Sequence, residues 1–126
     1  MLKKMKYVPI DDLKIYQDAM EIAEVIHKRV MQFPPIDRYS LGRQLVEAAD
    51  SIAANISEGY GRYFYKENKN FCYYARGSLF ETKTWLTKAK NRNLISHEEF
   101  SQLIQDLNIL HYNLNMYIKS IGSSNK

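Results

Sequence analysis

The strongest constraint on the fold is a stripe of apolar side chains near the end of the chain. Large apolar residues recur there at alternating intervals of three and four, namely Phe100, Leu103, Leu107, Leu110, Leu114, Tyr117 and Ile121. This spacing keeps one face of an α-helix apolar over about six turns. Ser96, followed three residues later by Glu99, forms the capping box that begins such a helix. The pattern predicts a long amphipathic helix that packs on other elements.

Three earlier segments show the same helical periodicity. They cover residues 11–33, 40–58 and 66–92. The first follows Pro9, has acidic residues in its opening turn and ends at Pro34-Pro35, and Gly59 closes the second. Five glycines and three prolines among 126 residues leave few turn signals, and most of them lie outside the segments. The chain is therefore predicted to be all-helical.

The links between these segments predict how the helices are arranged. The links at residues 33–39 and 93–95 are short, which favours antiparallel packing of the helices that they join. Ala48 and Ala49 in the second segment allow close approach of another helix. Together these features predict an antiparallel up-down-up-down four-helix bundle. We expect one domain over residues 1–126, with residues 1–10 as an N-terminal arm and residues 122–126 as a frayed tail.

Composition narrows the class of protein. Cys72 is the single cysteine, so no internal disulfide can form, and no stretch approaches the ~20 apolar residues of a membrane span. The basic start of the chain is followed by Pro9 and Asp11 rather than by an apolar signal core. We therefore expect a cytoplasmic protein with no membrane partner.

A polar stripe marks the predicted end of the second helix. Asn55, Glu58 and Arg62 recur at intervals of three and four, so they line one side of the helix and its exit. Gly59 and Gly61 are expected to supply the positive-φ backbone that ends the helix. The stripe predicts either a polar packing network or a ligand site.

The packing interpretation involves a small-residue notch on the third helix. Gly77 and Ser78 form this notch. A side-chain amide or carboxylate of the second helix, for example the Asn55 amide, could make hydrogen bonds there and fix the register of the two helices. Glu81, one turn beyond the notch, could pair with Arg62 or with an arginine of a neighbouring subunit. The sequence does not choose between these partners.

These motifs together resemble a known family. They are Ala48-Ala49, Ser51-Ile52, Asn55-Ile56-Ser57-Glu58-Gly59, Gly61-Arg62, Phe71, Ala75-Arg76-Gly77-Ser78-Leu79 and Glu81. The combination resembles the four-helix-bundle family named for proteins encoded in intervening sequences of bacterial 23S ribosomal RNA genes. The opening Leu13-Lys14-Ile15-Tyr16-Gln17-Asp18-Ala19 also fits, so the resemblance covers nearly the whole chain.

The resemblance implies a small bundle without established enzymatic activity that often assembles as a ring, typically a pentamer. It extends to the accessory variability proteins of diversity-generating retroelements, which bind nucleic acid and a reverse transcriptase. It thereby implies three kinds of partner: further copies of the chain, RNA or DNA, and a protein such as a reverse transcriptase.

The chain departs from the family pattern where the third helix begins. Tyr63-Phe64-Tyr65 stands where the family usually has a capping Ser or Thr, and Asn68 replaces a common aromatic residue. These aromatic side chains, with Tyr60, could pack over the bundle end, bury a subunit contact or stack bases.

Positive charge is concentrated in the third helix. Residues 66–95 hold seven basic and two acidic residues, a net charge of +5, whereas the rest of the chain is nearly balanced. Within this segment Lys69, Arg76, Lys83 and Lys90 lie seven residues apart and form one stripe ~32 Å long. Lys66 and Arg62 can extend it at one end, and Lys88 and Arg92 can broaden the other.

Two interpretations of this stripe remain open. It could lie along a phosphate backbone, with ring assembly multiplying the attraction, or it could be an ordinary solvated helix face. No helix-turn-helix, zinc-finger or RNA-recognition motif supports base-specific readout. The alternative function is a protein-protein adaptor whose basic face or aromatic cluster receives a partner protein.

An enzymatic function is not supported by the sequence. Glu24 and His27 have the spacing of a di-iron motif, but such a site requires a second Glu-x-x-His, which the chain lacks. Cys72 has no assigned base and is expected to be a small buried side chain. We therefore expect a non-enzymatic protein with no metal and no cofactor.

Overall fold

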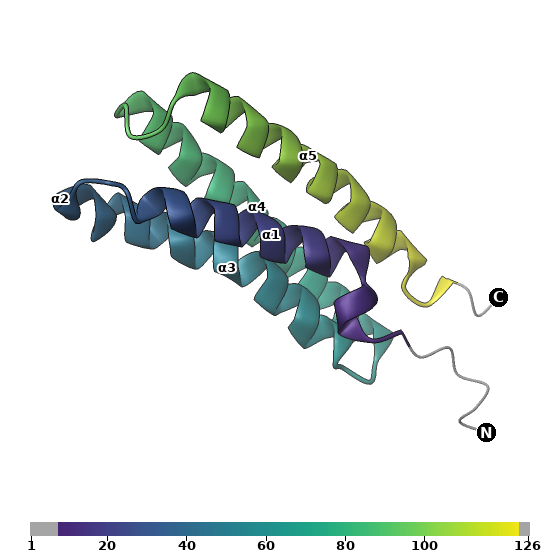
Figure 1. Ribbon diagram of the computed structural model, residues 1–126. Helices are drawn as coiled ribbons and strands as arrows, with labels where there is room; N and C mark the ends of the chain where they lie inside the picture. Colours follow the sequence, from purple (N-terminus) through teal and green to yellow (C-terminus); the bar gives the residue numbers. More distant parts are fainter. Residues whose placement is uncertain (1–7, 124–126) are drawn as a thin grey trace.

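The computed structural model describes residues 8–123 (Figure 1). Within this range the elements are η2 Ile10–Asp12, α1 Lys14–Val30, α2 Pro35–Arg38, α3 Leu41–Tyr60, α4 Tyr65–Asn91 and α5 His97–Ser120. Residues 1–7 of the expected N-terminal arm and residues 124–126 of the expected tail lie outside the described residues. No helix of the described part is both long and apolar enough to cross a lipid bilayer.

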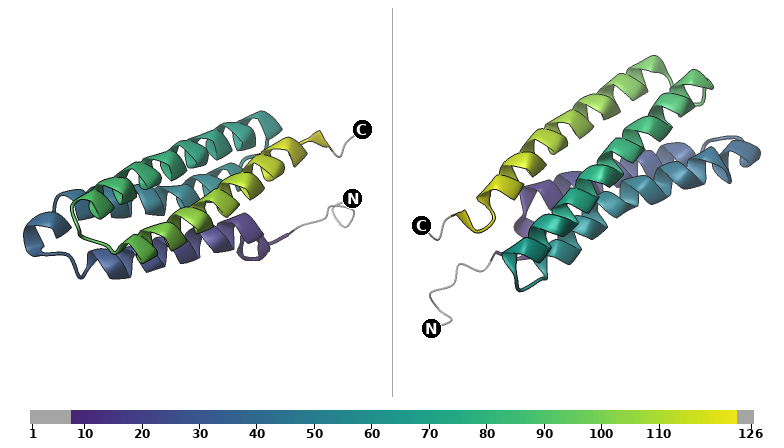
Figure 2. Two further views of the ribbon diagram at one scale, coloured as in Figure 1. Left: turned by 90° about the horizontal axis from the view of Figure 1, so that it is seen from above. Right: turned by 180° about the vertical axis from the view of Figure 1, so that it is seen from behind.

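The four long helices form the predicted antiparallel bundle. Each packs against the helix that follows it, so that α1 lies beside α3, α3 beside α4, and α4 beside α5, and α5 also contacts α1 (Figure 2). The fold prediction is thus confirmed. The short helix α2 occupies the link between α1 and α3, where Pro35 at its first position supplies a preset helical φ.

Each long helix contributes one apolar face to a single core. On α5 the predicted stripe is buried at Leu103, Leu107, Leu110 and Leu114, as its spacing of three and four requires. Thr82 of α4 is the polar side chain in this core, and its hydroxyl donates a 2.8 Å hydrogen bond to the Ser78 carbonyl oxygen of the preceding turn. Its polar group is therefore satisfied without a partner from another helix.

The end of α3 differs from the prediction. Gly59 lies inside the helix, which continues to Tyr60, and Gly61 follows it with a φ of −80°. Within residues 8–123 positive φ occurs at Asn93 and Gly122 instead. Gly59 is required by close packing, because a Cβ atom there would lie 2.8 Å from Asn68 Oδ1 and 2.9 Å from Phe71 Cβ of α4.

A polar clamp joins the end of α1 to the beginning of α5. Arg29 Nε donates to both carboxylate oxygens of Glu99 at 3.0 and 2.9 Å, and Arg29 Nη2 donates to the Leu94 carbonyl oxygen at 3.0 Å. Glu99 also completes the predicted capping box with Ser96. The backbone N–H of Ser96 and the Arg29 guanidinium hold the pKa of Glu99 below its usual value.

Candidate functional site

Four cations of α4 form a row along the seam between α4 and α5. We call Lys69, Arg76, Lys83 and Lys90 the basic row. Because a heptad drifts only about 20° around a helix, side chains seven residues apart stay on one side of it. All four side chains are half-buried, as is common for long cations whose apolar stems lie along a protein surface. The row is therefore part of the wall between two helices.

Helix α5 contributes neutral side chains to three members of the basic row. Arg76 Nη1 donates to Asn115 Oδ1 at 2.8 Å, and Lys83 Nζ donates to Asn108 Oδ1. Lys90 Nζ lies 4.5 Å from the centroid of the Phe100 ring. Asn108 and Asn115 are seven residues apart, as the cations are, and the antiparallel register brings the two series together. Sequence reasoning missed both asparagines, although this matching interval is a usable signal.

No carboxylate neutralises the basic row among residues 8–123. The ion pairs of the described part are Lys14–Asp18, Arg29–Glu99, Arg43–Glu47 and Arg62–Glu58. Amide oxygens and aromatic rings orient a cation but leave its charge in place. The row therefore keeps its positive charge at a partly desolvated surface, where charges interact more strongly with a ligand than in bulk water.

His111 of α5 lies within the same positive field. Its ring packs edge-on against Phe80, with centroids 4.9 Å apart. Burial, followed by the nearby charges of Lys83 and Arg76, lowers the pKa of His111 below its usual value of 6.5. At neutral pH the imidazole is therefore mostly uncharged.

Aromatic side chains stand beside the row on the outer surface of α4. Tyr73 and Phe80 are 43% and 48% exposed. The guanidinium carbon of Arg76 lies 5.0 Å from the Tyr73 ring centroid, and Lys83 Nζ lies 5.3 Å from that of Phe80. Each ring thus precedes its cation by three residues, nearly one helical turn.

The predicted extensions of the row differ from it. Arg62 pairs with Glu58 at 2.7 Å and lies over the Phe71 ring at 4.8 Å, so its charge is balanced. Lys66 is exposed in the first turn of α4, and Lys88 and Arg92 are exposed at the far end. The uncompensated part of the surface is centred on Arg76 and Lys83 rather than on the α3–α4 turn.

The predicted clasp between the second and third long helices is not formed. The Asn55 amide donates to the Ser51 carbonyl oxygen of its own helix at 2.9 Å, and Glu58 pairs with Arg62 one turn away. Gly77 points into open space, with no atom within 4 Å of a Cβ built on it, and Glu81 is exposed. The notch faces away from α3, because the core buries a different stripe of α4. The residues of that stripe are Cys72, Ala75, Leu79, Thr82, Leu86 and Ala89.

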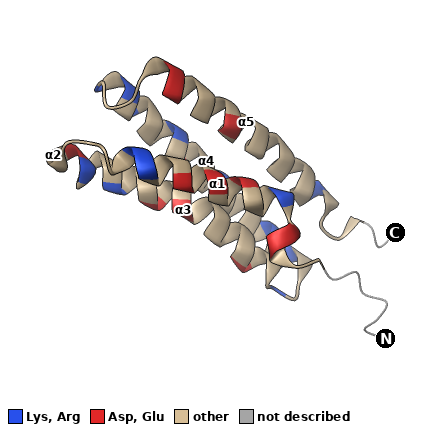
Figure 3. Cartoon of the chain, in the orientation of Figure 1, with Lys and Arg blue, Asp and Glu red and all other residues tan. Residues whose placement is uncertain are grey.

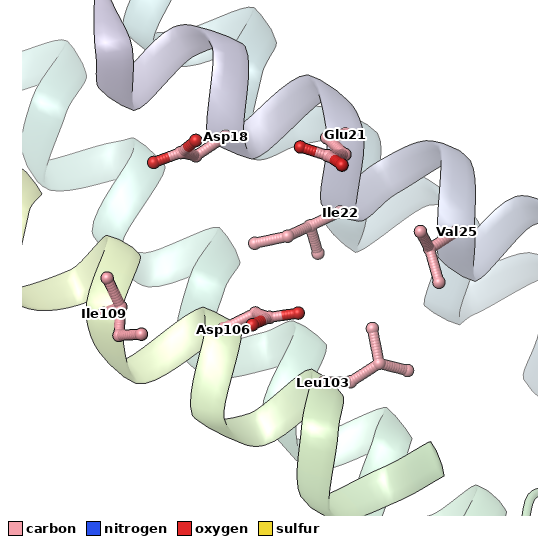
Figure 4. Close-up of a pocket in the computed structure, with 7 residues that line it drawn as sticks. All are labelled: Asp18, Glu21, Ile22, Val25, Leu103, Asp106 and Ile109. Atoms are coloured by element: carbon pink, nitrogen blue, oxygen red, sulfur yellow. The ribbon is translucent and has the colours of Figure 1, made fainter.

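A second surface, of opposite sign, lies on the other side of α5. A groove between α1 and α5 of about 240 Å³ has Ile22 and Leu103 in its floor and is bordered by Asp18, Glu21 and Asp106 (Figure 4). Figure 3 shows the acidic positions of α1 and α5 on this side of the bundle. Asp18 is paired with Lys14, whereas Glu21 and Asp106 have no cation within salt-bridge distance among the described residues. The groove therefore carries a charge opposite to that of the basic row.

Comparison with known proteins agrees with the architecture. A family model described as 23S rRNA-intervening sequence protein matches residues 11–116. A solved structure from Bacteroides thetaiotaomicron VPI-5482, described as a protein with unknown function from the S23 ribosomal protein family, superposes with a TM-score of 0.75. The two chains are 21% identical, and the alignment covers 84% of this chain and 99% of the other. At this identity the likeness shows the fold alone. No curated protein matches the sequence.

Proposed function

The chain belongs to the 23S rRNA-intervening sequence protein family, and from this premise we propose that it is a non-enzymatic scaffold that binds the nucleic-acid backbone. In this proposal the basic row of α4 carries the phosphate contacts, and several copies assemble as a ring, for which the family resemblance suggests a pentamer. The relation to retroelement accessory proteins, and a reverse transcriptase as partner, remain predictions.

The absence of carboxylate partners along the basic row is the observation that carries the proposal. Arg29, Arg43 and Arg62 each have an acidic partner, whereas no ion pair of the described residues includes Arg76 or Lys83. The cations are about 10.5 Å apart along the helix, or one for every three nucleotides of a B-form strand. Each protomer would therefore replace about three or four counterions.

Assembly would multiply this attraction. A row with three or four phosphate contacts binds weakly by itself, but a ring repeats the row around a symmetry axis and makes each further contact intramolecular. Exposed apolar residues at the α3–α4 turn offer one surface for self-association, because Tyr63 and Phe64 are 88% and 61% exposed and pack edge-to-face at 4.9 Å. The exposed rings of this turn also favour the alternative function, a protein-protein adaptor, because they could receive a partner protein.

A salt series distinguishes the two functions. Fluorescence anisotropy of labelled oligonucleotides between about 50 and 200 mM salt should give a log-log slope of about −2 to −4 per protomer. The double variant Arg76→Glu/Lys83→Glu should lose most of the affinity. Lys28→Glu/Arg43→Glu on α1 and α3 is the matched control, because either pair of reversals takes the formal net charge from +4 to zero.

The control decides how the result is understood. Equal losses in the two double variants would mean that net charge rather than the basic row drives binding. Absence of binding by the unaltered protein at low salt would remove the backbone-binding function and favour the adaptor. Native mass spectrometry of the same samples gives the number of copies, and a strict monomer would remove the ring from the proposal.

A further inference from the structure

We propose that the α4–α5 face binds single-stranded rather than duplex nucleic acid, with bases stacking on the Tyr73 and Phe80 rings beside the basic row. This inference rests on the proposed function and specifies its ligand class. We name two repeats on α4, Tyr73/Arg76 and Phe80/Lys83, the stacking units. In each unit a half-exposed ring and an unneutralised cation lie on adjacent turns.

The stacking units have the chemistry of a single-strand site. Proteins that bind unpaired strands combine a positive surface along the backbone with aromatic rings that take successive bases, and every base has a face that can stack. Arg76 and Lys83 also hold their rings from one side, at 5.0 and 5.3 Å from the ring centroids. This contact limits the rotation of each ring before a ligand arrives, which reduces the entropy lost on binding.

A hollow with both polar and apolar lining residues adjoins the first stacking unit. Its volume is about 510 Å³, and it is lined by Tyr73, Arg76, Asn115, Ile118 and Lys119. This volume is in the range of small-ligand sites. Arg76 uses one of its five N–H groups on Asn115, so the others can donate to a phosphate or to a base edge. Asn115 holds the guanidinium in place for that contact.

Helix α5 continues the same surface beyond the second unit. A further hollow of about 550 Å³ is lined by Phe100, Ser101, Ile104, Gln105, Asn108, Ile109 and Tyr112. Tyr112 is 66% exposed, and the Asn108 side chain connects this hollow to Lys83 of the row. Aromatic and amide groups therefore flank the cations on both helices, and the acidic groove beyond α5 confines a polyanion to this face.

A duplex cannot use these rings. Its bases are stacked on one another and present only edges in the grooves. A duplex on this face would therefore contact the cations but offer no base to stack on the rings. An unpaired strand can turn its bases toward Tyr73 and Phe80 while its phosphates follow Arg76 and Lys83. The interleaving of rings with cations is therefore informative, whereas charge alone would serve both ligands.

The test compares three ligands of equal length at one low salt concentration. They are a 15-nucleotide single strand, as oligo(dT) or oligo(U), a 15-base-pair duplex, and an abasic 15-mer strand that has phosphates but no bases. We expect the unaltered protein to bind the single strands at least tenfold more tightly than the abasic strand. The DNA and RNA arms show whether the 2′-hydroxyl contributes.

Ring removal provides the second arm. Tyr73→Leu/Phe80→Leu keeps apolar volume but removes both stacking faces, and it should weaken single-strand binding by tenfold or more and duplex binding by less than twofold. Tyr39→Leu is the matched control, because Tyr39 is also exposed and lies 5.3 Å from an arginine, Arg38, but is remote from the row. It should leave single-strand binding unchanged.

The outcomes separate this inference from the function on which it rests. Equal affinity for the abasic and base-bearing strands would overturn stacking while leaving backbone binding intact, and this comparison needs no variant. Equal losses for single strand and duplex in Tyr73→Leu/Phe80→Leu would also overturn it. Failure of the unaltered protein to bind any of the three ligands would overturn both the inference and the proposed function.

Discussion

Two helical glycines should respond to alanine substitution in opposite directions. Gly59 of α3 is buried, and a Cβ atom there would lie 2.8 Å from Asn68 Oδ1, 2.9 Å from the Asn68 carbonyl oxygen and 2.9 Å from Phe71 Cβ. Gly77 of α4 is exposed, and a Cβ atom there would meet nothing within 4 Å. The pair therefore tests whether α3 and α4 are held as close as the structure indicates.

The expected magnitudes follow from two effects. Alanine is favoured over glycine in a helix interior by about 1 kcal/mol, because glycine loses more backbone entropy on folding. At Gly77 nothing opposes this gain, so Gly77→Ala should raise the free energy of unfolding by about 0.5–1 kcal/mol. At Gly59 an added methyl group would lie 2.9 Å from both the Asn68 carbonyl oxygen and Phe71 Cβ, neither of which can rotate away. The cost should therefore lie in the upper part of the overpacking range, at about 2–3 kcal/mol. Gly59→Ala should thus be destabilising by about 1–2 kcal/mol after the entropy gain is subtracted.

Urea unfolding followed by circular dichroism at 222 nm measures both variants against the unaltered protein. The free energies of unfolding of the two variants should differ by about 1.5–3 kcal/mol, which linear extrapolation can resolve for a domain of this size. A Gly59→Ala protein as stable as the unaltered one would refute the close approach of α3 to α4. A loss of stability in Gly77→Ala would show that Gly77 does not face open space.

Further predictions concern the cap of α5, the clamp and the histidine of the basic face. Ser96→Ala removes the hydroxyl oxygen that accepts a 3.0 Å hydrogen bond from the Glu99 backbone N–H. Thermal unfolding should show a decrease of about 1 kcal/mol in the free energy of unfolding, and an unchanged midpoint temperature would argue against the cap. Glu99 has a lowered pKa, so its contribution to stability is complete above its ordinary value of 4.5 and is lost as pH falls through the folded-state value. Glu99→Gln should therefore flatten the fall in stability below about pH 5, and a parallel fall in both proteins would contradict this. Bound phosphates would balance Lys83 and Arg76 and raise the pKa of His111, so oligonucleotide affinity should increase from pH 7.5 to 6, but not in His111→Gln. A pH-independent affinity of the unaltered protein would count against His111 facing the ligand.

Local patterns were sufficient to predict the bundle. The burial of Leu103 and Leu107 follows from helical periodicity, and the α5 start follows from Ser96 and Glu99, because both depend on residues within two turns of one another. Short links then limit consecutive helices to antiparallel packing. These features need no knowledge of distant contacts, and for this reason the sequence was a reliable guide to them.

The role of Gly59 could not be obtained in this way. A glycine near a helix end fits both a positive-φ stop and a close helix contact, and only the position of Asn68 on α4 decides between them. The predicted clasp was wrong for a similar reason. The notch at Gly77 lies about three turns from the start of α4, and the direction in which it faces depends on which stripe of the helix the core buries. Here Leu79 and Thr82 are buried and Gly77 is outside.

The candidate site was predictable on one helix but not across two. The seven-residue interval from Lys69 to Lys90 placed the cations on one face, and the structure keeps them there. Their partners required the register of α4 against α5, which brings Arg76 to Asn115 and Lys83 to Asn108. Carboxylates at those two positions would have neutralised the row, so two amide side chains on α5 determine whether this face can attract a polyanion.

The opposite charges on the two flanks of α5 limit how the proposed ring can assemble. A ring that closed by inserting the basic row of one copy into the acidic groove of the next would neutralise Glu21 and Asp106 but would also cover the face proposed for the strand. Such a ring should dissociate at high salt, and nucleic acid would compete with assembly. A ring closed through apolar contacts, such as those available at Tyr63 and Phe64, should persist at high salt while the strand is released. The proposed function needs the ring and the bound strand at the same time. We therefore expect native mass spectrometry to show an assembly whose copy number does not change between about 50 and 500 mM salt. Dissociation of the assembly over that range would mean that self-association and strand binding exclude each other.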